Sequence, residues 1–215
     1  MKMNLKKISF WFLILLFIFV LSTFLHECGH GFSNQLNGVS VSTGFNRVGN
    51  VFSFPHDSNF RVGFDETQTF LLDYGVPITL ILTILFTTLL CMKKNWKSSS
   101  VIIVAGFSLC NAIIRLVPCS ISVISTLITQ SLHVEDEIQT GQLLAQQMGV
   151  SWIIILPLLI SISISIICLV AAVRKCKKVE YFQFKGVWTI LILAYITSFF
   201  LENYLDNILR INWII

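Results

Sequence analysis

Five long apolar runs dominate the sequence, and shorter polar stretches separate them. The runs cover residues 8–33, 69–91, 100–118, 151–173 and 187–208. Each run is close to or above the roughly 20 residues that an α-helix needs to cross a bilayer core of about 30 Å. The pattern predicts an all-α polytopic membrane protein with about five transmembrane helices.

The stretches between the runs predict two smaller elements. Residues 38–62 alternate apolar and polar side chains around Gly49-Asn50, which predicts a small β-hairpin between the first and second helices. Residues 119–150 are predicted to form an outward loop that contains a polar helix. The sequence has no internal repeat, so residues 1–215 are predicted to form a single membrane domain.

Composition strengthens the membrane interpretation. The chain is 55% hydrophobic and only 12% charged, and its mean hydropathy is +0.80. Soluble domains are about one quarter charged, so these residues cannot cover a whole surface that faces water. The first run could be a signal peptide, but it lacks a small-x-small cleavage site and continues directly into His26 and Glu27. We therefore expect a retained membrane anchor.

The basic residues predict the orientation of the chain. Eleven of the 15 Lys and Arg residues precede the first run, follow the second, or lie between the fourth and fifth. Five crossings put these three groups on one side, and positively charged loops stay in the cytoplasm. We expect an integral, multi-pass membrane protein with a cytoplasmic N-terminus, whose C-terminus and active-site end face outward. The residues are Lys2, Lys6, Lys7, Lys93, Lys94, Lys97, Arg174, Lys175, Lys177, Lys178 and Lys185.

Two further features exclude classes of protein. Since the basic residues account for orientation, the net charge of +4 does not indicate a nucleic-acid partner, and we expect the lipid bilayer in its place. The six cysteines show no paired spacing, and most lie in apolar runs, so a disulfide framework is not expected.

The end of the first run carries His26-Glu27-Cys28-Gly29-His30, an H-E-x-x-H motif. On an α-helix His26 and His30 lie one turn apart on one face, so both imidazoles can bind one Zn²⁺ ion. Glu27 lies beside them and can act as general base toward a zinc-bound water. The alternative is a pair of interfacial histidines with a glutamate that extends to the lipid headgroups. Ionisable side chains inside a membrane helix cost roughly 2.5–3.5 kcal/mol each at its centre, which favours the functional interpretation.

Two histidines need a third protein ligand if one position is to stay open for water. Asp136 and Glu137 lie just ahead of the polar helix, and Asp73 precedes the second run. Glu202 and Asp206 share a face near the outer end of the fifth run, and this E-x-x-x-D spacing is similar to the third-ligand helix of gluzincins. His56 and His133 lie in the predicted loops.

Together these motifs resemble the site-2 protease family of intramembrane zinc metalloproteases. The resemblance covers about residues 20–150 and includes the H-E-x-x-H, the Gly75-Val76-Pro77 start of the next span, and Asn111 followed by Pro118 ahead of an acidic residue. It implies that Asp136 is the third zinc ligand, followed by Glu137 where the family has Gly. It also implies that strands such as those predicted within 38–62 bind an extended substrate as an additional strand.

Asn111 and Arg115 lie one helical turn apart near the outer end of the third run. We expect the Asn111 amide to hydrogen-bond the substrate backbone, and Arg115 to neutralise a carboxylate or stabilise a developing oxyanion. For Arg115 the alternative is a side chain that extends to the outer headgroups.

The function predicted from these residues is peptide-bond hydrolysis by an intramembrane zinc metalloprotease. His26, His30 and Asp136 would bind Zn²⁺, Glu27 would activate the water, and another membrane protein or a peptide would be the substrate. One alternative is a non-catalytic zinc-binding membrane protein, either a pseudoprotease or a metal carrier. Others are a gluzincin-like membrane protease that uses Glu202 as third ligand, and a purely structural helical subunit.

Overall fold

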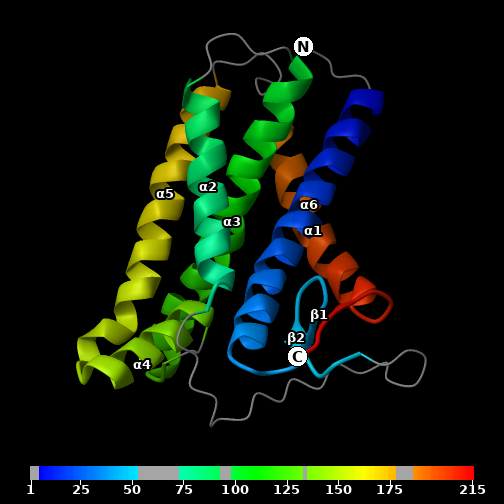
Figure 1. Cartoon of the computed structure of the whole chain (residues 1–215). Helices are drawn as coiled ribbons and strands as arrows, with labels where there is room; N and C mark the ends of the chain where they lie inside the picture. The colour runs from blue at the N-terminus through cyan, green and yellow to red at the C-terminus, as the bar shows by residue number, and fades with distance from the viewer. Residues whose placement is uncertain (1–4, 53–72, 93–97, 133–134, 178–185) are drawn as a thin grey trace.

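The structure is a computed structural model that describes residues 5–52, 73–92, 98–132, 135–177 and 186–215. Its helices run roughly along one direction, and a small sheet and a short crossing helix lie at one end (Figure 1). The helices are α1 (Leu5–Leu36), α2 (Gly75–Met92), α3 (Ser98–Thr129), α4 (Asp136–Met148), the 3₁₀-helix η1 (Ser151–Ile155), α5 (Leu156–Cys176) and α6 (Val187–Leu205). The strands are β1 (Val41–Thr43), β2 (Val48–Gly49) and β3 (Ile211–Trp213).

Five helices of the described chain are long and apolar enough to cross a membrane, which confirms the predicted fold class. Large apolar side chains on their outer faces are exposed, among them Phe17, Leu85, Ile167 and Phe200, at 48–69%. A soluble protein rarely exposes so continuous an apolar surface, so these faces are suited to lipid. The spans are Ile8–Leu36, Gly75–Met92, Val101–Thr129, Ser151–Cys176 and Val187–Leu205.

The helices pack around α1 and α3. The α3 helix contacts α1, α2 and α5, whereas α6 packs against α1. Trp11, Leu15 and Phe19 of α1 are at most 2% exposed and join one apolar core with residues of α3, α5 and α6. The α1 helix starts at the end of the bundle opposite α4 and the sheet, so the second half of α1 reaches the end where these elements lie (Figure 1).

The α3 helix is longer than predicted. The sequence interpretation ended this span at residue 118 and assigned 119–150 to a loop with a polar helix, but α3 continues to Thr129. Pro118 lies inside α3; a proline there removes one backbone hydrogen bond and usually kinks or ends a helix. Packing compensates, because buried Cys119 forms a second small core with Ile138 of α4 and Leu158 of α5.

The other predicted boundaries differ by a few residues. The predicted ends at 33, 91, 173 and 208 compare with observed helix ends at 36, 92, 176 and 205. Residues 69–72 of the second run and 53–62 of the predicted β element lie outside the described residues. The hairpin turn lies at Gly44–Arg47, where the Gly44 N–H donates to the Arg47 carbonyl at 2.9 Å, and not at Gly49-Asn50.

The sheet contains a strand that the sequence interpretation did not predict. Its order is β2-β1-β3, with both pairings antiparallel, so the C-terminal β3 lies beside β1. Trp213 of β3 donates its indole N–H to the Thr43 hydroxyl at 2.9 Å. Its ring packs on Gly31 of α1, where any side chain would collide with it. The sheet is thus held against α1 immediately after the H-E-x-x-H turn.

Candidate metal centre

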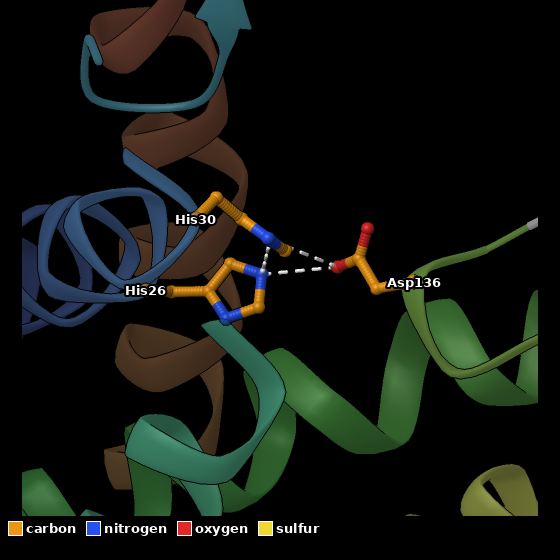
Figure 2. Close-up of side chains that lie close together, drawn as sticks. All are labelled: His26, His30 and Asp136. Carbon is orange, nitrogen blue, oxygen red and sulfur yellow. Dashed lines mark hydrogen bonds and ion pairs between the residues drawn. The ribbon is translucent and has the colours of Figure 1, made fainter. Parts of the chain in front are cut away.

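The two histidines of the H-E-x-x-H motif face one point. They lie on consecutive turns of α1, and their Nε2 atoms are 3.0 Å apart. The α4 helix contributes Asp136, whose Oδ2 is 3.0 Å from Nε2 of His26 and 3.6 Å from Nε2 of His30 (Figure 2). His26, His30 and Asp136 form the group of potential metal ligands found among the described residues.

These separations suit a zinc ion. With zinc–ligand bonds of about 2.0–2.1 Å, neighbouring ligand atoms of a tetrahedral site are about 3.3 Å apart. The separations of 3.0, 3.0 and 3.6 Å between the three ligand atoms bracket that value. Two imidazoles and one carboxylate also form the usual three-ligand set of a catalytic zinc site, which leaves a fourth position for water.

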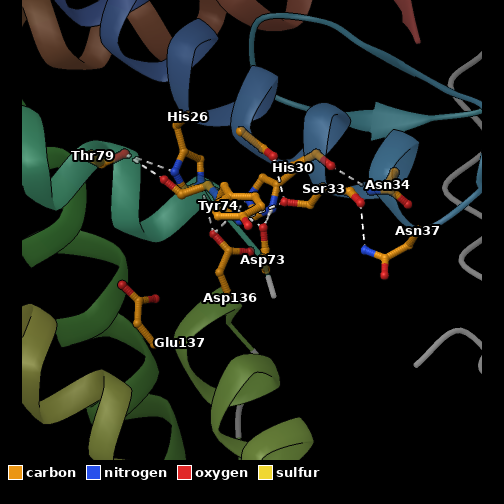
Figure 3. Close-up of polar contacts among 12 residues, drawn as sticks. His26, His30, Ser33, Asn34, Asn37, Asp73, Tyr74, Thr79, Asp136 and Glu137 are labelled. Carbon is orange, nitrogen blue, oxygen red and sulfur yellow. Dashed lines mark hydrogen bonds and ion pairs between the residues drawn. The ribbon is translucent and has the colours of Figure 1, made fainter. Parts of the chain in front are cut away.

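Asp73 fixes the ring of His30. Its Oδ1 lies 2.7 Å from Nδ1 of His30 and also accepts the Gly75 N–H at 3.1 Å (Figure 3). Burial would raise the pKa of the Asp73 carboxyl, but the hydrogen bond and charge of His30 outweigh burial and lower it. An ionised Asp73 can only accept, so Nδ1 of His30 carries a hydrogen and Nε2 is the ring nitrogen that faces His26 and Asp136.

Thr79 plays the corresponding part for His26. Nδ1 of His26 is 3.0 Å from the Thr79 hydroxyl, which itself donates to the Gly75 carbonyl at 3.2 Å. With its hydrogen used there, the hydroxyl accepts from Nδ1 and leaves the Nε2 lone pair of His26 free. Asp73 and Thr79 both come from the segment that begins α2, so one segment fixes both imidazole rings.

Three potential ligand atoms therefore converge on one point. Burial would raise the pKa of the Asp136 carboxyl, but contacts with His26 and His30 hold it well below its usual range, so Asp136 is ionised. The three side chains lie 3.0–3.6 Å apart, close enough to share hydrogens, and a divalent ion bound by neutral imidazoles and a carboxylate would take the place of those hydrogens. Nη1 of Arg115 is 3.4 Å from Asp136 and 3.5 Å from His26, which is long for a hydrogen bond. The donor set fits a divalent ion.

Two glycines allow the start of α2 to approach α1 closely. A Cβ on Gly29 would lie 2.8 Å from backbone atoms of Tyr74 and Gly75, and a Cβ on Gly75 would lie 2.5 Å from the His30 ring. The contact is reinforced by Ser33, whose hydroxyl accepts the Tyr74 N–H at 2.8 Å (Figure 3). Without side chains at these glycines, Asp73 and Thr79 can reach the histidines.

A cavity of about 250 Å³ opens beside the three ligand atoms. Glu27 lines it together with His30, Asp73 and Asp136, so the predicted general base and the metal group share one space. The hairpin turn forms another wall and is held by Asp206, which accepts the N–H groups of Phe45 and Asn46. Further lining residues are Ser33, Asn34, Asn46, Arg47, Val48, Gln139, Thr140 and Leu143.

The remaining predicted residues lie outside the three-ligand group. Glu137 is fully buried and faces Arg115 at 3.6 Å, and Glu202 is buried on α6. Asn111 is buried on α3, donates to the Phe107 carbonyl of its own helix, and does not line this cavity. Arg115 does not line it either, and is only 3% exposed. The substrate-binding roles of Asn111 and Arg115 stay predictions.

Sequence reasoning missed the roles of Thr79 and Asp206, and it considered Asp73 only as a ligand. One sequence feature could have indicated a role for two of them. Asp73 and Asp206 are ionisable residues near the ends of apolar runs, where such residues are unusual. His56 and His133 lie outside the described residues. A comparison of the chain with protein-family models, with characterised proteins and with solved structures finds no match.

Proposed function

We propose that this protein is an intramembrane zinc metalloprotease in which His26, His30 and Asp136 hold the metal ion. One observation carries the proposal: the Nε2 atoms of two imidazoles and a carboxylate oxygen meet within 3.6 Å, beside a cavity that Glu27 also lines. When bound, zinc would polarise a peptide carbonyl and lower the pKa of a water molecule to about 7.

Glu27 is the residue to which we assign the proton transfer. It follows His26 directly on α1, is 9% exposed, and borders the cavity that the ligand atoms also border. A carboxylate held in this position can take a proton from water and later return it to the leaving amine. A metal carrier would have no need of an acid here, which favours hydrolysis over zinc storage.

The hairpin offers a way to hold an extended peptide. In the described sheet β2 is at one edge, and its Val48 lines the cavity together with Asn46 and Arg47 of the turn. An edge strand has backbone N–H and C=O groups that can pair with a substrate strand. A membrane helix must unwind before its peptide bond is attacked, and such pairing would satisfy the freed backbone groups. The substrate class we propose is therefore a membrane protein or a peptide in extended form.

Glu27→Gln is the direct test. The amide cannot accept the proton, so we expect cleavage of a single-span membrane reporter to fall about 10²–10⁴-fold, while zinc measured by mass spectrometry stays stoichiometric. Removal of zinc with a chelator should also abolish cleavage, and added zinc should restore it.

Glu202→Gln is the matched control, because it makes the same change in a buried carboxylate outside the ligand group. It should retain both zinc and cleavage. Loss of zinc in Glu202→Gln would favour the gluzincin-like ligand set. A Glu27→Gln protein that cleaves at the wild-type rate would refute the mechanism.

A further inference from the structure

A buried group of charges links α3 to the helix that carries Asp136. Arg115 of α3 is 3% exposed, and its Nη1 lies 3.4 Å from Oδ2 of Asp136 and 3.6 Å from Oε1 of Glu137. Asp136 and Glu137 are the first two residues of α4. One guanidinium therefore contacts both acidic residues of the turn that presents the third ligand.

Glu137 is fully buried, although it is not part of the ligand group. Among the described residues its oxygens accept no hydrogen bond from a nitrogen or hydroxyl group, and the Cys119 thiol lies beside it. An uncompensated buried carboxylate is strongly unfavourable, so the charge of Arg115 is needed to neutralise it. In Figure 3, Asp136 points to the histidine pair, whereas Glu137 lies to one side of it, next to α3.

One apolar contact and one close backbone contact hold the next turns of α4. Ile138 is 1% exposed and packs with Cys119 of α3 and Leu158 of α5. Gly141 lies so close to the Ile154 carbonyl of η1 that no side chain fits between them. The Arg115 contacts come at the very start of α4, where the direction of the Asp136 carboxylate is decided.

We propose that Arg115 is a positioning residue, which binds Glu137 and Asp136 and so presents the Asp136 carboxylate to His26 and His30. This inference rests on the proposed zinc site. It keeps the neutralisation of a carboxylate expected from the sequence but not the contact with a substrate, since a side chain this deeply buried and absent from the cavity lining is poorly placed for that contact.

The charge of Arg115 has a second effect on zinc affinity, in the opposite direction. Arg115 is a cation 3.5 Å from Nε2 of His26, so by charge alone it would repel a metal ion. If repulsion dominates, removal of the charge strengthens zinc binding. If positioning dominates, removal weakens zinc binding, because Asp136 is no longer held in place.

The experiment measures the zinc affinity of the purified full chain in detergent by competition with a chelating dye. Arg115→Gln should bind zinc about 10- to 100-fold more weakly than wild type, the usual range for loss of a residue that orients a ligand. Arg115→Lys keeps the charge but lacks the planar fork, so it should fall between wild type and Arg115→Gln. Arg174→Gln removes an exposed arginine at the far end of α5 and should match wild type.

Cobalt supplies a readout that general destabilisation would not change. The visible spectrum of bound Co²⁺ reports its coordination, so the spectrum of Arg115→Gln should shift toward that of Asp136→Ala. Arg115→Lys should keep most of the wild-type spectrum. The lysine variant also maintains the test if Arg115→Gln does not fold.

The outcomes separate this inference from the function it rests on. If wild type binds zinc and both Arg115 variants match it, or bind more tightly, the positioning role is wrong and the metal site stands. If wild type binds no zinc, the proposed function and this inference are both overturned.

Discussion

At the scale of single residues, the protonation of two imidazoles decides what the site can do. Asp73 lies 2.7 Å from Nδ1 of His30, and Thr79 lies 3.0 Å from Nδ1 of His26. Each contact favours a hydrogen on Nδ1 and leaves Nε2 as the ring nitrogen available to a metal ion. The pair of histidines is therefore prepared to bind a cation by residues that would not touch it.

Substitution of Asp73 tests whether orientation of the His30 ring contributes to zinc binding. Asp73→Ala removes the acceptor for Nδ1 of His30, and we expect zinc affinity to fall up to about 100-fold. Asp73→Asn retains an acceptor oxygen but loses the charge, so its loss should be nearer tenfold. Zinc competition on the purified chain measures both, with Glu202→Gln as the control for exchange of a buried carboxylate for an amide. Equal affinity in Asp73→Ala and wild type would show that His30 needs no orienting partner.

At the scale of elements, the contact between α1 and the start of α2 sets the position of the histidines. The H-E-x-x-H motif of α1 needs the α2 segment within reach, and the Gly29–Gly75 contact provides that closeness. Helix propensity does not favour glycine in either segment, since glycine destabilises a helix relative to other residues. The two glycines are explained by the contact between the helices.

Gly75→Ala should displace the His30 ring, because its Cβ would lie 2.5 Å from Cε1 and Nε2. We expect weaker zinc binding and a loss of stability of about 1–3 kcal/mol from overpacking, measured by dye competition and thermal unfolding in detergent. Gly106→Ala is the matched control. Its Cβ would meet Cδ1 of Ile18 at 2.6 Å, the flexible end of a side chain that can rotate away. Gly106→Ala should keep wild-type zinc affinity; if Gly75→Ala does so as well, the close contact is unimportant for the site.

At the scale of the whole molecule, five apolar helices bring the metal centre to one end of the bundle. Eleven of the 15 basic residues lie at or before the start of α1, between α2 and α3, or from the last turn of α5 to the start of α6. Because successive helices alternate in direction, the start of α1, the end of α2 and the end of α5 lie at the end opposite α4 and the sheet (Figure 1). From the charge bias we propose that the basic end is cytoplasmic and that the metal centre lies toward the outside.

Thiol labelling of intact cells tests this orientation. In a cysteine-free background, Ser131→Cys between α3 and α4 should react with a membrane-impermeant reagent added outside, because Ser131 is exposed at the metal-centre end. Lys177→Cys, at the exposed end of α5, should react only after the membrane is permeabilised. The reverse pattern would place the site in the cytoplasm.

Local information in the sequence was sufficient for much of this architecture. The helices follow from apolar length, which acts within each segment. The pairing of His26 with His30 follows from helical periodicity, since residues four apart share a face. Glu27, which lies between them on the same turn, could likewise be predicted as general base from the motif alone.

Contacts between distant segments could be learned only from the folded molecule. Asp136 is 110 positions from His26, and its approach depends on how α4 packs against α3, α5 and η1. The helix through Pro118 and the pairing of β3 with β1 depend likewise on neighbours that outweigh local propensity. The acid at position 73 became an orienting residue rather than a ligand because α2 packs against α1 through two glycines. Sequence determined which groups can bind a metal ion; packing decided which of them meet, because coordination requires atoms to converge within a few ångströms.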